Sequence, residues 1–229
     1  MEDYPSLCKN MTKIIMVRHG QSVANQQERF AGYSNFNLTE LGEQQASRAA
    51  EYLADKGIIP DVIYSSDLMR AHNTALPFSK KFNLPINDTP TLREISAGKW
   101  EGMRFVDINE QYPQDWAVWK NDFANSRCTD GESAKELYRR IVSAVTAIAK
   151  ENIGKTILIT THATPVRAID CYSRGLGENG LGEVKFVRNA SISIFEYIEN
   201  DGSISPVSVG LIDHLDEFMV TSVPKSVQG

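Results

Sequence analysis

The chain has 229 residues, the size of one domain or of one domain with an insertion. Its 24 Lys and Arg against 29 Asp and Glu give a net charge of −5, with no block of like charges, so no nucleic-acid partner is expected. No apolar run approaches the ~18 residues of a membrane-spanning helix, so no membrane partner is expected either.

The N-terminal region and the cysteines predict a cytoplasmic location. Residues 1–11 lack the basic start and apolar run of a secretory signal. Cys8, Cys128 and Cys171 are scattered and show no Cys-x-x-Cys spacing, which argues against disulfides and thiolate zinc sites. We expect ordinary thiols in a reducing compartment.

Strands and helices alternate over the first two thirds of the chain. From Thr39 the sequence TELGEQQASRAAEYLADKG places its apolar residues on one helical stripe, with Thr39 as N-cap and Gly57 as the C′ residue. Other helices are expected at about 67–82, 132–152 and from Pro165 to near Gly175. Short apolar runs predict strands at 13–17, 61–65 and 156–160.

The last third and one middle segment depart from this alternation. Beyond Lys185 polar and apolar residues alternate on both sides of a turn at 200–202, which predicts a hairpin at the sheet edge. The segment at about 96–131 has no strand pattern and holds all three tryptophans, so it is expected to be a mostly helical cap insertion. The prediction is one α/β domain over 1–229: a three-layer sandwich with a mainly parallel sheet, an antiparallel edge strand and helices on both faces.

Polar residues follow several of the predicted strands. Ligands of parallel α/β sheets bind outside the carboxyl ends of the strands, so these positions are candidates for a site. Arg18 and His19 follow the first strand, and Arg70 lies one helical turn after the second. Glu94 follows the segment near Ile86, and His162 follows the strand at 156–160. We expect these five residues to meet at one rim.

This set of residues suits phosphoryl transfer. An imidazole with a free lone pair is a nucleophile, and guanidinium groups bind phosphate and disfavour protonation of the imidazole. His19 is the candidate nucleophile, and Arg18, Arg70 and His162 would stabilise the phosphoryl group without a metal. Glu94, kept protonated by a poorly solvated site, is the candidate proton donor. No metal or other cofactor is expected; a zinc site is the weaker alternative, since no metal-ligand spacing occurs.

Other motifs are assigned no role in the site. His72 would point about 200° away from Arg70 on a helix, and His214 follows the last strand pattern. Gly154, Lys155 and Thr156 imitate the end of a nucleotide-binding loop but precede a strand, which predicts a helix-to-strand turn. The tryptophans favour a packed insertion core, with a partly apolar or planar substrate as the alternative.

Six segments in order resemble the signatures of the histidine phosphatase superfamily, which has a phosphoglycerate mutase-like fold: VRHGQSVAN, LTELGEQQA, SSDLMRAHNTA, LREISAGKWEG, DGES and THATPVRA. The resemblance runs from about Lys13 to Ser191. It implies that His19 is phosphorylated, that Glu94 donates the proton, and that the phosphate contacts are Arg18, Asn25, Arg70, His162 and the backbone N–H of Ala163. Ala163 stands where the family often has glycine.

The short segment after Glu94 also resembles the cap of the phosphatase members more than the longer one of the mutases. The resemblance therefore implies a metal-independent phosphomonoester hydrolase that acts through phosphohistidine on a small phosphorylated metabolite. The alternatives are a phosphoglycerate mutase and a non-catalytic phospho-ligand-binding protein. The substrate and the oligomeric state, for which a homodimer is one candidate, are left open.

Overall fold

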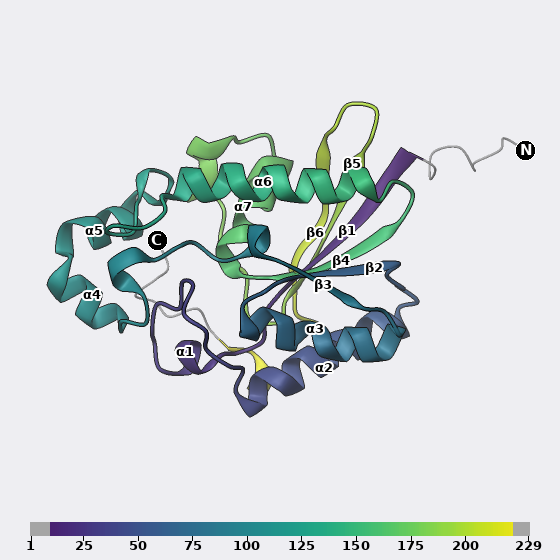
Figure 1. The fold of residues 1–229 in the computed structure, drawn as a ribbon, viewed down its shortest axis with the longest axis horizontal. Coiled ribbons are helices and arrows are strands. Elements are labelled where there is room, and N and C mark those ends of the chain that lie inside the picture. The colour runs from purple at the N-terminus through teal and green to yellow at the C-terminus, as the bar shows by residue number, and fades with distance from the viewer. Residues whose placement is uncertain (1–9, 222–229) are drawn as a thin grey trace, which may run out of the picture.

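A computed structural model describes residues 10–221 (Figure 1), so the predictions for residues 1–9, including Cys8, fall outside the described part. One six-stranded sheet has the order β3-β2-β4-β1-β5-β6. The strands are β1 (Met11–Arg18), β2 (Val62–Ser66), β3 (Ile86–Thr89), β4 (Thr156–Thr161), β5 (Ile192–Ile198) and β6 (Ile204–Leu211). The first four are parallel, whereas β5 pairs antiparallel with β1 and β6 with β5. The predicted mainly parallel sheet with an antiparallel edge is confirmed.

Helices cover both faces of this sheet. They are α1 (Val23–Gln26), α2 (Glu40–Asp55), α3 (Met69–Phe82), α4 (Phe105–Gln111), α5 (Pro113–Asn121), α6 (Ala134–Glu151) and α7 (Ala163–Ser173). Figure 1 shows α2 and α3 on one face and α6 and α7 on the other, whereas α4 and α5 project beyond the sheet. The predicted three-layer arrangement is therefore confirmed.

Capping groups fix the helix boundaries. The Thr39 hydroxyl accepts a hydrogen bond from the N–H of Gly42, and Gly57 closes α2 with φ +68°, both as predicted. The start of α6 differs slightly from the prediction. Ser133 is an extended N-cap that forms a capping box with Glu136, so the helix begins at Ala134 rather than near residue 132.

The core lies on both sides of the sheet because successive side chains of a strand point to opposite faces. In β1, Ile14 and Met16 belong to the cluster under α6 and α7, and Ile15 and Val17 belong to the cluster under α2 and α3. All four side chains are fully buried. A strand that is covered on both faces has a continuous apolar sequence, and KIIMV at the predicted first strand shows this pattern.

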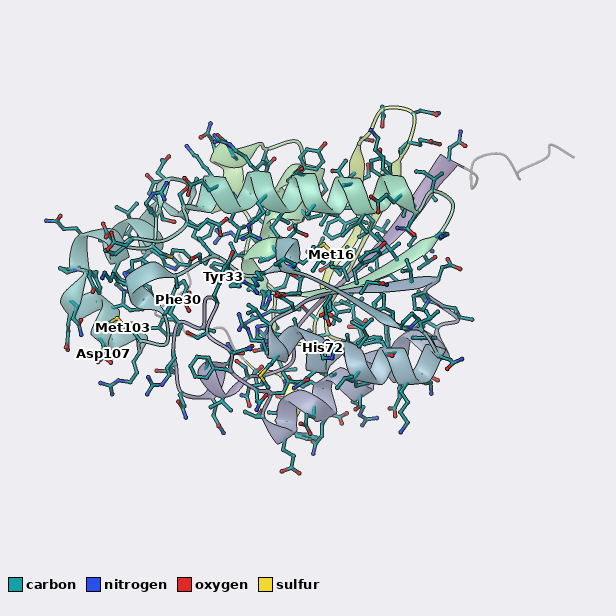
Figure 2. The ribbon with its side chains drawn as sticks, in the orientation of Figure 1. Met16, Phe30, Tyr33, His72, Met103 and Asp107 are labelled. Atoms are coloured by element: carbon teal, nitrogen blue, oxygen red, sulfur yellow. The ribbon has the colours of Figure 1, made fainter. Side chains whose placement is uncertain are left out.

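The three tryptophans form the packed interior around α4 and α5. Trp100 and Trp116 meet edge to face with ring centroids 5.7 Å apart, and Trp119 contacts Phe30 at 5.0 Å. All three are almost completely buried, as the favoured core interpretation predicts. Figure 2 shows Phe30 beside this segment, so the loop that follows β1 and α1 is packed against it.

Gly20 lets the loop after β1 approach the start of α2. A Cβ at this position would lie 2.2 Å from the backbone oxygen of Gly42. Gly20→Ala is therefore expected to displace the loop that carries His19 and to lower the free energy of unfolding by ~1–3 kcal/mol in chemical denaturation. Gly182→Ala is the matched control, since its Cβ would meet nothing within 4 Å. Equal stability of the two variants would contradict this close contact.

Candidate active site

Two histidines meet at the carboxyl edge of the sheet. β1 and β4 are neighbouring parallel strands in which Arg18 pairs with Thr161, so His19 and His162 follow at the same height. Their ring centroids lie 5.2 Å apart with the planes at 64°. Both side chains are buried. The structure thus brings together the two imidazoles that were expected to meet at one rim.

Two buried arginines lie beside these rings. Arg70, in the first turn of α3, is fully buried and donates to the carbonyl oxygens of Gly32 at 2.7 Å and Ser34 at 3.0 Å. Arg18 donates through Nη1 to the carbonyl of Val187 at 2.6 Å. Within residues 10–221 neither arginine forms an ion pair with a carboxylate.

The site contains buried nitrogen atoms that lack partners. Arg18 Nε, Arg70 Nε and His162 Nδ1 make no hydrogen bond to any described residue. Leaving a buried donor unpaired is costly, and a tetrahedral oxyanion offers acceptors to several donors at once. The donor set therefore suits a phosphate group.

The electrostatic environment favours neutral imidazoles. Burial, followed by the Arg70 and Arg18 guanidinium groups, lowers the pKa of His19 well below its ordinary value of 6.5. Burial and Arg70 likewise lower the pKa of His162 well below 6.5. Burial also lowers the pKa of both arginines to about 10, so they remain charged at neutral pH. Two neutral rings therefore lie beside two cations.

Hydrogen bonds fix the tautomer of each ring. His19 Nδ1 lies 2.7 Å from the carbonyl oxygen of Gly20, which only accepts, so Nδ1 carries the proton and Nε2 has the free lone pair. His162 Nε2 lies 2.8 Å from Ser66 Oγ, whose proton has no other acceptor among the described residues. We therefore infer that the hydroxyl donates to Nε2 and that the His162 proton is on Nδ1, which has no partner there. One ring suits attack and the other suits donation to an oxyanion.

Glu94 faces the same pocket from the segment that comes after β3 and a short 3₁₀ turn (Pro90–Leu92). Its Oε1 accepts from the N–H of Ile95 at 2.9 Å, and Oε2 lies 3.4 Å from the N–H of Thr164 in the first turn of α7. The carboxyl group is half-buried. The side chain is therefore held at the pocket by backbone groups of two separate elements.

The predicted neutral contacts also lie at the pocket. Asn25 Oδ1 accepts from the N–H and hydroxyl of Ser22, so its Nδ2 remains available as a donor. Ala163 is the first residue of α7, where helix N–H groups lack intrahelical partners. Six of the seven predicted site residues line one pocket, and His162 lies against His19.

The outer part of the pocket is aromatic. The loop after α1 contributes Phe30, α4 and α5 contribute Phe105 and Trp119, and the segment before β5 contributes Phe186. Arg29 also lines the pocket. The predicted insertion therefore supplies wall residues as well as its own core, and a group joined to the phosphate would contact apolar surface.

Asn189 is a site residue that the sequence did not reveal. Its buried side-chain amide donates to the carbonyl of His19 at 3.1 Å, and lies 3.3 Å from that of Gly20 and 3.1 Å from Asn25 Oδ1. It thus links the loop that carries His19 to the Asn25 side chain. In the sequence, only its position just before β5, close to the same rim, indicated that Asn189 could belong to the site. The position of Ser66 at the end of β2 was an equally weak indication.

The residues excluded from the site do lie elsewhere. His72 is on α3 (Figure 2), with Nδ1 2.9 Å from the Asp88 carboxylate. His214 does not line the pocket and is half-buried, with Nε2 2.9 Å from the Ala190 carbonyl oxygen. Gly154, with φ +80°, turns the chain from α6 into β4, as predicted.

The two described cysteines are buried, and the acidic residues of the described part form no metal-binding cluster. Burial raises the pKa of Cys128 well above 9.0 and that of Cys171 to about 11, which is typical of unreactive thiols. In residues 10–221 no three His, Cys, Asp or Glu side chains are placed to hold a metal ion. None of the helices described is long and apolar enough to cross a membrane.

The lowered pKa values of His19 and His162 predict that the stability of the fold depends on pH. Because their pKa values are lowered on folding, the unfolded chain binds protons below about pH 6.5 that the folded chain does not. The free energy of unfolding is expected to fall as pH falls through this region, by up to ~1.4 kcal/mol per pH unit for each histidine. Urea unfolding of wild type and His162→Asn checks this: the variant should show the shallower slope, and equal slopes would contradict it.

The chain is similar to known proteins over most of its length. A model of the histidine phosphatase superfamily (branch 1) matches residues 14–208. Phosphoserine phosphatase 1 of Hydrogenobacter thermophilus is 31% identical over 210 residues, which cover 92% of this chain and 97% of that protein. A 2,3-bisphosphoglycerate-dependent phosphoglycerate mutase of Bifidobacterium longum is 28% identical over 221 residues, or 85% of this chain and 89% of that protein.

A solved structure agrees with these relatives. Bacillus stearothermophilus YhfR is 26% identical and superposes with a TM-score of 0.83, covering 90% of this chain and 100% of that one. The resemblance noted in the six sequence segments is therefore confirmed over nearly the whole described chain. This chain belongs to the histidine phosphatase superfamily, branch 1.

Proposed function

We propose that the protein is a metal-independent phosphomonoester hydrolase that acts through a phosphohistidine at His19 on a small phosphorylated metabolite in the cytoplasm. One observation carries the proposal: a neutral imidazole with its Nε2 lone pair free shares a pocket with two buried guanidinium groups and lies 5.2 Å from a second imidazole. The relative named phosphoserine phosphatase 1 supports hydrolysis of this class.

The first step transfers the phosphoryl group to the protein. His19 Nε2 attacks phosphorus, the bond from phosphorus to the ester oxygen breaks, and Glu94 gives its proton to the departing alkoxide. Arg18, Arg70 and His162 Nδ1–H stabilise the charge on the equatorial oxygens. As positive charge develops on the ring of His19, the Gly20 carbonyl, which accepts from Nδ1–H, stabilises it.

The second step releases phosphate. The Glu94 carboxylate takes a proton from water, the water oxygen attacks phosphorus, and the bond between phosphorus and Nε2 breaks. Inorganic phosphate leaves, and both His19 and Glu94 return to their starting protonation states. The atoms and charges balance without a metal ion.

The aromatic wall supports substrates whose alcohol carries an apolar or planar group. Phe105 and Phe186 are half-buried at the pocket, so their rings are accessible to a ligand. Burying such a group contributes roughly 25 cal/mol for each Å² of apolar surface. We propose that this wall, rather than the phosphate site, selects among phosphomonoesters.

The decisive experiment follows both the intermediate and the product. Wild-type protein with excess chelator is incubated with benzyl phosphate, and acid quench and base quench are compared for bound phosphate. We expect a protein-bound phosphoryl group that is acid-labile and base-stable, together with free phosphate. His19→Gln, prepared identically, should yield neither.

A second incubation separates hydrolysis from isomerisation. With 3-phosphoglycerate, formation of 2-phosphoglycerate without free phosphate would favour a mutase, the activity for which the Bifidobacterium longum relative is named. Tight binding of phosphate with no adduct and no turnover would instead indicate a binding protein. Either result would overturn the proposal.

A further inference from the structure

The segment DGES at 130–133 takes no part in the two chemical steps, but it holds a partly buried ion pair close to Glu94. Arg140 of α6 donates to Glu132 through Nε at 2.9 Å and through Nη2 at 2.8 Å, a bidentate pair. Only 23% of the Arg140 side chain and 14% of the Glu132 side chain are exposed. Among the ion pairs of residues 10–221 this one has the lowest exposure at both partners taken together.

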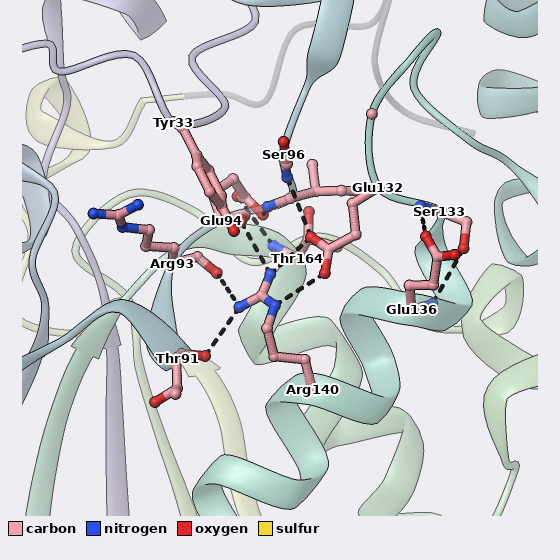
Figure 3. A network of polar contacts seen from close by, with 12 residues as sticks. Tyr33, Thr91, Arg93, Glu94, Ser96, Glu132, Ser133, Glu136, Arg140 and Thr164 are labelled. Carbon is pink, nitrogen blue, oxygen red and sulfur yellow. Dashed lines mark hydrogen bonds and ion pairs between the residues drawn. The ribbon is translucent and has the colours of Figure 1, made fainter.

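The same arginine holds the backbone before Glu94. Its Nη1 donates to the carbonyl oxygens of Thr91 at 2.9 Å and Arg93 at 3.1 Å, and Nη2 lies 3.2 Å from the carbonyl oxygen of Glu94. Figure 3 shows Arg140 between this backbone and Glu132. One planar guanidinium group therefore fixes the stretch of backbone that leads to the carboxyl group.

The glutamate partner holds the backbone after Glu94. Glu132 Oε2 accepts from the N–H of Ser96 at 3.2 Å, and the Glu132 N–H donates to the Ser96 carbonyl at 2.9 Å. Gly131 permits this approach, because a Cβ there would lie 2.4 Å from the Ser96 oxygen. The ion pair therefore forms hydrogen bonds with the backbone on both sides of Glu94.

We propose that Glu132 and Arg140 are positioning residues that hold Glu94 at the distance at which it can protonate the leaving group. This inference rests on the proposed function. Neither residue is among those that line the pocket. Glu94 Oε1 accepts from the N–H of Ile95, which lies within the stretch of backbone that the pair contacts, and Oε2 accepts from the N–H of Thr164 in α7. A misplacement of about 1 Å in a reacting group costs ~10²-fold in rate.

Two substrates of similar size isolate the proton donor. Nitrophenolate leaves as a stable anion without a proton, whereas the benzyl alkoxide formed from benzyl phosphate requires one. The kcat/KM value contains only the steps up to departure of the leaving group, so it excludes the later hydrolysis of phosphohistidine. The ratio of kcat/KM for benzyl phosphate to that for 4-nitrophenyl phosphate therefore measures protonation by Glu94.

Arg140→Met is expected to lower this ratio by ~10- to 100-fold, with kcat/KM for 4-nitrophenyl phosphate changed by less than ~3-fold. Glu132→Gln, a milder change that replaces the carboxylate with an amide of similar size, should also lower the ratio, and it keeps the test available if Arg140→Met folds poorly. Arg139→Met is the matched control: it lies next to Arg140 on α6 and forms a bidentate pair with Glu178 at the surface, away from the pocket.

A double-mutant cycle separates positioning from a general structural role. In the Glu94→Gln background, where the donor is already absent, Arg140→Met should change the ratio no further. Equal loss for both substrates, or the same loss with and without Glu94, would overturn the inference while leaving the hydrolase intact. If wild type itself forms no phosphohistidine with either substrate, the proposed function fails instead.

Discussion

Replacing His19 with glutamine is expected to abolish hydrolysis. In the proposed mechanism the lone pair of Nε2 is the attacking group, and an amide that fills a similar volume offers no comparable nucleophile. In another enzyme that forms a covalent intermediate, removal of the nucleophile lowers kcat by a factor on the order of 10⁶, and a loss of that order is expected here. Initial release of phosphate from benzyl phosphate measures the change.

The control for this variant is His72→Gln. His72 is a histidine on α3 that pairs with Asp88 outside the pocket, so its replacement should leave phosphate release within about 3-fold of wild type, as for surface positions without a special role. Binding of inorganic phosphate to His19→Gln should persist, because both arginines remain. Turnover of His19→Gln at the wild-type rate would refute the mechanism.

The second large effect is expected for Arg70. This guanidinium group is fully buried, charged at neutral pH, and already fixed by the carbonyls of Gly32 and Ser34. Such a group stabilises transition-state charge without reorganising, and arginines in this role contribute ~10³- to 10⁵-fold to phosphoryl transfer. Arg70→Met is expected to lower kcat/KM by ~10³-fold and to weaken inhibition by inorganic phosphate.

Arg70→Lys tests whether charge alone suffices. A single ammonium group cannot contact two carbonyls and a phosphate in the planar arrangement of arginine, so we expect ~10²-fold loss despite the retained charge. Arg48→Met, which removes an exposed partner of Asp216, is the matched control. If Arg70→Lys retained full activity, the planar arrangement of the guanidinium nitrogens would be irrelevant and only the charge would matter.

Much of this site was predictable because its residues come directly after strands that the sequence marks clearly. KIIMV and TILIT are continuous apolar runs, and in a parallel sheet the residues after such strands lie at one edge. That rule alone brings His19 and His162 together, and the structure places them 5.2 Å apart. Helix boundaries shifted by about two residues: α6 begins after the Ser133 cap, and α7 begins at Ala163 rather than near Pro165 without a side-chain cap.

The supporting residues were not predictable in the same way. Ser66, Asn189 and Arg140 act through hydrogen bonds to backbone or side chains far away in the sequence. Such contacts depend on tertiary packing and leave no local periodicity or motif. DGES resembles a family signature, but the contact between Glu132 and the segment that carries Glu94 joins residues 36 apart in the sequence, and no local pattern predicts it.

The place of β1 and β4 inside the sheet has a kinetic consequence. Each is hydrogen-bonded to a neighbouring strand on both sides, so its amide protons should exchange with solvent deuterium only when the whole chain unfolds. The two strand ends that carry the imidazoles would then separate no more often than the molecule denatures. The two imidazoles would therefore keep their spacing in every folded molecule that meets substrate.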